Sequence, residues 1–267
     1  MARFASLFLL AILIIFTTGC AENLTQEEIQ ERILEANSNL DSYSLDVTGS
    51  MQVGFEFLGQ RFDMTYNLDA DEKIDRKNKE MYARFDLSSS SGQINQDAVM
   101  ETYVIDNYLY TMTNGGWSKT RLDEDIWTRQ DQFIKTFELY KDGKVEFLGE
   151  EEIDGKTYYK AKITPDYNKV AAIYNQPNLK VESYSSTVWI NKKTFIIERI
   201  ITGIKIKAGV NQEDDEKAIK LFGGAGASYN FDVKIKNINE RVDITLPAEA
   251  LNAKEEVMPD NNPLVIS

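Results

Sequence analysis

The chain has 267 residues, a net charge of −13, 42% hydrophobic residues and no histidine. Its apolar content is enough for a folded core, and its acidity disfavours binding to nucleic acid. The lack of histidine excludes Ser-His and Cys-His catalysis, His-ligated zinc and a histidine pH switch.

The first twenty residues have the organisation of an export signal. Arg3 precedes an apolar run over residues 4–16, which is too short to span a bilayer, and small residues lead to Cys20. This arrangement resembles the lipobox of prokaryotic lipoproteins, in which the cysteine sulfur takes a diacylglyceryl group, although Thr17 stands where leucine is usual. We expect a signal peptide at residues 1–19 and a lipid anchor at Cys20, on the extracytoplasmic face of the cell membrane. An ordinary secretory signal with an incidental cysteine is the alternative.

A short tether and a helix are expected next. Residues 20–24 form the tether, and Asn23 begins a glycosylation sequon of a kind that often arises by chance. Thr25 and Glu28 are spaced as a capping box, which predicts the start of a helix of about 15 residues. Cys20 is the only cysteine, so no internal disulfide is expected.

Beyond residue 44 the apolar residues alternate, which predicts antiparallel hairpins. One face of the first three strands is rich in aromatic residues and methionine, interrupted at Gly49. The candidate lining of a ligand cavity on this face is Met51, Val53, Phe55, Phe57, Phe62, Met64, Tyr66 and Phe85. The alternative for each of them is ordinary core packing against helices.

The rest of the chain continues this pattern with one helical excursion. Residues 88–92 read as a loop, 123–140 as a helix, and 209–227 as a mobile acidic and glycine-rich insertion. Further hairpins lie between them. Residues 251–267 form a polar C-terminal tail, and the chain is expected to fray after Pro247.

This order of elements resembles the LolA/LolB-like lipoprotein carriers and the related LppX-type lipoproteins, over nearly all of residues 25–250. Four stretches carry the resemblance: residues 34–44, 108–119, 188–194 and 244–250. In the third, Asn191 stands where the family motif has aspartate. The resemblance implies an α+β, mostly antiparallel fold, in which a curved half-barrel sheet has helices packed on its concave face. It also implies an apolar cavity that shelters acyl chains, and it brings no catalytic motif.

The sequence therefore predicts a membrane-anchored lipoprotein that binds a lipid or another apolar ligand for shielding, transfer or sensing. A cell-surface scaffold or interaction module with a filled core is the alternative, and an envelope protein is a possible partner. No enzyme activity is expected, since the chain has no histidine and no nucleophile motif, and the carboxylates read as solvated charges; no metal or cofactor is expected. The three tryptophans, Trp117, Trp127 and Trp189, allow sugar binding, but a strand or helix tryptophan is more often a packing anchor.

Overall fold

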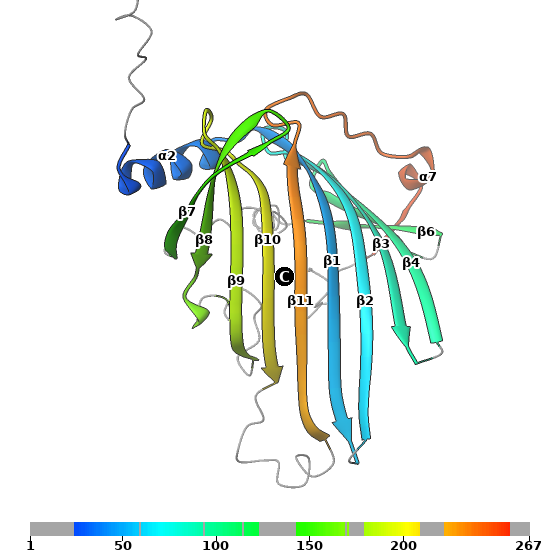
Figure 1. Cartoon of the computed structure of the whole chain (residues 1–267). Helices are drawn as coiled ribbons and strands as arrows, with labels where there is room; N and C mark the ends of the chain where they lie inside the picture. Colours follow the sequence, from blue (N-terminus) through cyan, green and yellow to red (C-terminus); the bar gives the residue numbers. More distant parts are fainter. Residues whose placement is uncertain are drawn as a thin grey trace, which may run out of the picture.

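The computed structural model describes residues 24–58, 60–92, 94–113, 115–122, 143–168, 170, 179–208 and 222–256. Their main feature is one open sheet with the strand order β12-β6-β5-β4-β3-β2-β1-β11-β10-β9-β8-β7 (Figure 1). All neighbours are antiparallel except β12 and β6, which pair in parallel. Cys20, Asn23 and the expected helix at 123–140 lie outside the described residues.

The strands are longer than the apolar patterns alone suggested. Their bounds are β1 (Ser42–Phe57), β2 (Gln60–Asp75), β3 (Glu80–Ser91), β4 (Ile94–Ile105), β5 (Tyr108–Thr113), β6 (Gly116–Arg121), β7 (Lys144–Ile153), β8 (Lys156–Thr164), β9 (Leu179–Asn191), β10 (Ile197–Ala208), β11 (Phe222–Lys236) and β12 (Lys254–Glu255). The described helices are α2 (Gln26–Ser38) and the short α7 (Ala248–Leu251). No described helix is long and apolar enough to cross a membrane.

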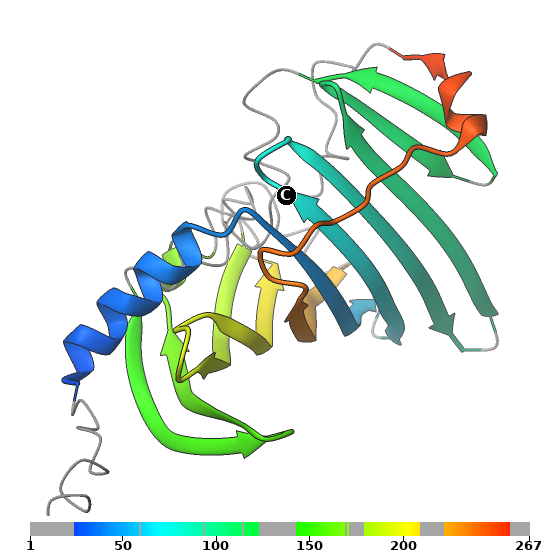
Figure 2. The same cartoon turned by 90° about the horizontal axis from the view of Figure 1, so that it is seen from above.

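The sheet curves strongly, and α2 covers the part of its concave face made by β7 to β10 (Figure 2). This confirms the half-barrel that the sequence predicted. The helix begins with the expected capping box, in which Glu28 N–H donates to the Thr25 hydroxyl at 3.2 Å and Thr25 N–H donates to the Glu28 carboxylate at 2.7 Å. Its apolar residues Ile29 and Ile33 join the main core.

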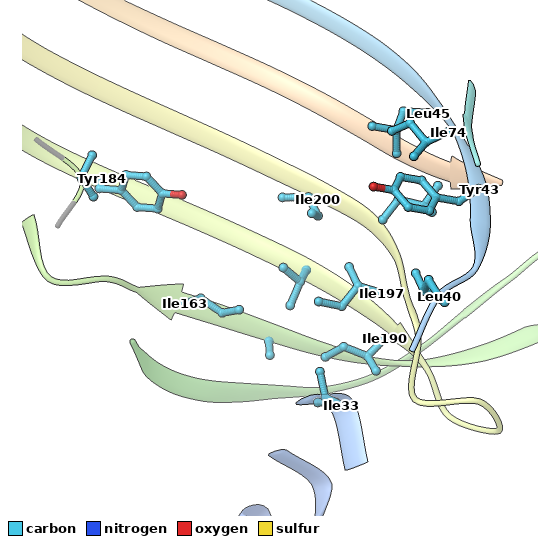
Figure 3. Packing of buried hydrophobic residues seen from close by; sticks show 14 of the residues in the cluster. Ile33, Leu40, Tyr43, Leu45, Ile74, Ile163, Tyr184, Ile190, Ile197 and Ile200 are labelled. Carbon is cyan, nitrogen blue, oxygen red and sulfur yellow. The ribbon is translucent and has the colours of Figure 1, made fainter. Parts of the chain in front are cut away.

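The main core lies where the strands converge beneath α2. Figure 3 shows Ile33 of the helix facing Ile190 and Ile197. Tyr43, Leu45 and Ile74 lie together on the neighbouring strands. The other labelled residues of this core are Leu40, Ile163, Tyr184 and Ile200. Burial of these apolar side chains contributes about 25 cal/mol per Å² removed from water. The core therefore fixes the helix to one side of the half-barrel.

A buried amide also ties α2 to the sheet. Asn37 is 2% exposed, and its amide nitrogen donates to the carbonyls of Ile33, at 2.7 Å, and Phe195, at 3.0 Å. The backbone N–H of Ile197 donates to the Asn37 side-chain oxygen at 3.0 Å. Three backbone groups at the helix end and at the start of β10 thus depend on one side chain.

Three sequence predictions are wrong in detail. The serines at 88–91 continue β3 instead of forming a loop, because each pairs with a residue of β4. Residues 222–227, assigned to the insertion, belong to β11, where Gly226 pairs with Gly54 of β1 and the register shifts nearby. Glycines suit such a β-bulge, since no side chain opposes the close approach of the strands.

The chain also stays ordered beyond Pro247, where fraying was expected. Ala250 of α7 and Ala253 are buried, and β12 pairs with Ser118 and Lys119 of β6. The N–H of Glu256 donates to the carbonyl of Lys119 at 2.8 Å. Backbone pairing with a free sheet edge stabilises this segment despite its polar side chains.

Candidate ligand-binding face of the sheet

Alternation along each strand gives the sheet two chemically different faces. The concave face carries the side chains that share a side with Tyr43 and Leu45 of the main core. The convex face carries their immediate neighbours, such as Ser44 and Asp46. The contrast means that one face of the same sheet is apolar and the other is polar.

Strand pairing brings the predicted cavity-lining residues together on the concave face. On β1 and β2 the pairs are Met51 with Tyr66, Val53 with Met64, and Phe55 with Phe62. Phe85 of β3 lies on the same face, opposite Ala70. These residues are partly buried apart from Phe62, which is 40% exposed. The side chain of Phe57 is outside what the structure describes.

Direct contacts join neighbours within this set. The rings of Phe55 and Phe62 stack with their centroids 5.3 Å apart, near the free end of the hairpin. The Tyr66 hydroxyl lies 3.6 Å from the sulfur of Met64, the weak acceptor it contacts. Methionine adapts its shape easily, so this part of the face can accommodate different apolar groups.

Sequence reasoning missed the other half of this surface. β11 and β10 continue the same face on the far side of β1, because Met51 pairs with Tyr229 and Tyr229 pairs with Ile204. The added residues are Ile204, Ile206, Tyr229, Phe231 and Val233. The alternation from 229 to 235 was visible in the sequence, but nothing local shows that the late strand β11 pairs with the first strand.

The aromatic residues of β11 lie close to one another and to β1. The Tyr229 and Phe231 rings are stacked, with centroids 6.3 Å apart. Burial raises the pKa of the Tyr229 hydroxyl. We call the concave-face residues of β10, β11, β1, β2 and β3 below the main core the apolar trough.

The space beneath α2 differs from the apolar trough because it is filled. The hollow between the helix residues Gln30, Ile33 and Leu34 and the strands has a volume of only about 20 Å³. One water molecule needs roughly this much space, so no acyl chain fits there. Among the described residues, the apolar trough is therefore a better candidate than this hollow for a larger ligand.

On the convex face, ion pairs and contacts between cations and aromatic rings join neighbouring strands. Arg199 binds the carboxylate of Asp232 with two nitrogens, and this hydrogen-bonded pair holds the pKa of Asp232 below its usual range. Lys160 and Arg199 each lie 5.0 Å from the ring of Trp189. Trp189 is 6% exposed, so it is a packing anchor and offers no face to a sugar.

A polar cluster at the β9–β10 turn explains a departure from the family motif. The side-chain oxygen of Asn191 accepts the Lys193 N–H at 3.0 Å, as an aspartate would, and its amide nitrogen donates to Glu198 at 2.7 Å. Glu198 also accepts from Tyr158 at 2.7 Å and from Lys156 at 2.9 Å. Burial raises the pKa of Glu198, but these hydrogen bonds outweigh it and leave the pKa lowered.

The described residues contain no group of three or more acidic, histidine or cysteine side chains placed to hold a metal ion. The clusters around Glu198 and Asp232 are internally paired. The part of the site that stands out chemically is therefore the apolar trough.

A family model and several solved structures are similar to this chain. Residues 25–144 match the model of a family of unknown function, DUF6612. No curated protein matches the chain in sequence. LprF from Mycobacterium bovis is similar in structure, with 17% identity, a TM-score of 0.47, and coverage of 84% of this chain and 98% of that one.

Two further solved structures are similar. The Mycobacterium tuberculosis lipoprotein LppX has 15% identity and a TM-score of 0.43, with 83% of this chain and 100% of that one covered. A LolA superfamily protein from Nitrosomonas europaea has 13% identity and a TM-score of 0.23, with 84% and 96% covered. The likeness concerns the fold alone.

Proposed function

We propose that this chain is a membrane-anchored extracytoplasmic lipoprotein that binds a lipid or another apolar ligand in the apolar trough, for shielding, transfer or sensing. The observation that carries the proposal is the continuous apolar surface across β10, β11, β1, β2 and β3, on a sheet whose other face is polar. Binding is non-covalent, and burial of ligand surface at about 25 cal/mol per Å² drives it. The chain acts without catalysis in this proposal.

The anchor limits where binding takes place. A diacylglyceryl group on Cys20 would leave only a few residues of tether before α2, which begins at Gln26. Each buried methylene of a lipid anchor contributes about 0.8 kcal/mol, so two chains hold the protein firmly. The ligand would then be collected and delivered close to one membrane.

A matched pair of substitutions tests ligand binding. Met51→Asp places a charge in the apolar trough, and Ser50→Asp places the same charge next to it on the convex face. Mature protein purified without detergent is examined by native mass spectrometry and by titration with a fluorescent fatty acid. We expect the parent and Ser50→Asp to bind the probe and Met51→Asp to lose binding with its fold retained in circular dichroism. Absence of both co-purified lipid and probe uptake in the parent would refute the proposal.

Anchoring is tested separately from ligand binding. We expect Cys20→Ser to abolish incorporation of labelled palmitate and to move the protein from the membrane to the soluble fraction. A variant that stays at the membrane without the label would contradict lipidation at Cys20. Ligand binding by the soluble domain would be unaffected by that result.

The second candidate is a cell-surface scaffold or interaction module with no ligand. The filled space beneath α2 favours it, since this half of the fold is built as an ordinary core. A parent protein that takes up no apolar probe but is stabilised by an envelope protein partner would support the scaffold.

A further inference from the structure

An aromatic patch lies on the convex face, which is otherwise polar. Across β2 to β6 the strand pairing puts five residues in one row: Lys73, Tyr82, Tyr103, Tyr110 and Lys119. The next row is Asp71, Arg84, Glu101, Met112 and Trp117. Three tyrosines and a tryptophan thus adjoin one another on the face that the core does not use.

The neighbouring aromatic rings of this patch are tilted relative to one another. The centroids of Tyr82 and Tyr103 are 4.8 Å apart at 48°, and those of Tyr103 and Trp117 are 5.8 Å apart at 53°. Tilted rings do not cover each other's faces as stacked rings do, and Tyr82, Tyr110 and Trp117 are only half-buried. The partly exposed rings of Tyr82, Tyr110 and Trp117 therefore offer aromatic surface to a ligand, whereas Trp189 is 6% exposed.

A buried hydroxyl lies in the centre of the patch. Tyr103 is 8% exposed, and no described residue hydrogen-bonds to its hydroxyl. Burial, with the nearby Tyr82 and Glu101, raises the pKa of Tyr103 to about 12, so the hydroxyl keeps its proton at neutral pH. A buried polar group without a partner among the described residues favours a ligand or water that supplies one.

Charges of both signs border the rings. Arg84 donates to both Asp86 oxygens and, at 3.0 Å, to Glu101. Lys73 lies 5.8 Å from the centre of the Tyr82 ring, Lys119 lies 5.5 Å from that of Tyr108, and Asp71 lies in the row of Arg84. Asp69 pairs with Asp86 on the same face, so four carboxylates and three cations lie around the rings. The patch therefore suits a neutral ligand that needs both donors and acceptors.

We propose that this patch, made of Tyr82, Tyr103, Tyr110, Trp117, Arg84 and Glu101, binds a neutral oligosaccharide. Sugar rings present apolar C–H faces that lie on aromatic rings, and hydroxyl groups that both donate and accept hydrogen bonds. A peptide added as an extra strand is disfavoured because β12 already pairs with the edge strand β6. The proposal is independent of the apolar trough, which lies on the other face.

Saturation-transfer NMR on the mature chain tests the proposal with three probes: cellotetraose, maltotetraose and tetra-N-acetylchitotetraose. We expect at least one to bind with a Kd of about 1 mM or tighter. Trp117→Ala and Tyr82→Ser should each weaken that binding by about tenfold, the size expected for loss of one aromatic contact. Phe62→Ala, which removes an exposed ring from the concave face, should leave sugar binding unchanged.

The two sites can be told apart in the same experiment. Met51→Asp should lose the fatty-acid probe and keep the sugar, while Trp117→Ala should do the reverse. Failure of all three sugars to bind, or binding that persists unchanged in both Trp117→Ala and Tyr82→Ser, overturns the sugar proposal. Neither outcome bears on the apolar trough.

Discussion

The ring of Phe231 on β11 lies directly over Gly49 of β1. The two residues pair across the strands, and a Cβ atom built on Gly49 would stand 2.5 Å from Cδ1 of the ring. No ordinary side chain fits at this distance. The interruption at Gly49 in the apolar pattern of β1 is therefore the place that Phe231 occupies in the apolar trough.

Gly49→Ala is expected to destabilise the fold by about 1–3 kcal/mol, since the ring must move out of a packed position. Urea unfolding measures the change in the free energy of unfolding. Gly116→Ala is the control, because its Cβ would meet only Thr113 O at 3.7 Å, an ordinary contact. Phe231→Ala in the Gly49→Ala background should recover part of the loss, and equal destabilisation by both glycine variants would contradict the contact.

Asn37→Ala is expected to lower the free energy of unfolding by about 2–3 kcal/mol, because it leaves buried backbone groups of Phe195 and Ile197 without partners. The neighbouring exposed residue gives the control: Ser38→Ala loses only a hydrogen bond to Glu35 O. Thermal melting of both variants would show the difference. A melting temperature of Asn37→Ala equal to that of Ser38→Ala would show that the amide does not tie α2 to β10.

Asn191→Asp restores the residue usual in the family motif and is nevertheless expected to destabilise this protein. The new carboxylate would face Glu198, which now accepts the Asn191 amide at 2.7 Å. Repulsion acts while both groups are ionised, so the loss in stability should be largest at neutral pH and shrink as pH falls below about 4. Asn191→Ala removes the same hydrogen bonds without adding charge, and its loss should lack this recovery in acid.

Acid is expected to weaken the wild-type fold through Asp232. Its pKa is lowered in the folded protein by the hydrogen-bonded Arg199, so the unfolded chain binds the proton more readily. The stabilising contribution is complete above the unfolded pKa of about 4 and is lost as pH falls through the lower folded value. Between about pH 6 and about pH 3, the free energy of unfolding should therefore depend less on pH in Asp232→Asn than in the wild type.

The exposed pair of Arg241 and Asp243 is the control for that measurement. Its side chains are 89% and 75% exposed, and surface ion pairs of this kind add little to stability. We expect Asp243→Asn to leave the pH dependence of unfolding as it is in the wild type. If Asp232→Asn showed the same pH dependence of unfolding as the wild type, the ion pair with Arg199 would not contribute to the stability of the fold.

Local patterns predicted the fold well where the chemistry is local. The capping box of Thr25 and Glu28 marks the start of α2, and alternation marks the concave positions of β1 and β2, because both signals depend on residues close in sequence. The serines of β3 and the glycines of β11 gave no such signal. Their strand structure comes from neighbours that pair with them, so propensity alone misassigned them.

The sequence by itself determined antiparallel hairpins and a capped helix, and it indicated Met51, Val53 and Phe55 as one apolar face; the half-barrel was implied by the family resemblance. Only the tertiary structure decided that β11 pairs with β1, which doubles the trough and places Phe231 on Gly49. It also decided that Tyr82, Tyr103 and Trp117 adjoin on the convex face. The physical reason is that alternation assigns each side chain to a face, while the order of strands in the sheet depends on contacts between residues far apart in sequence.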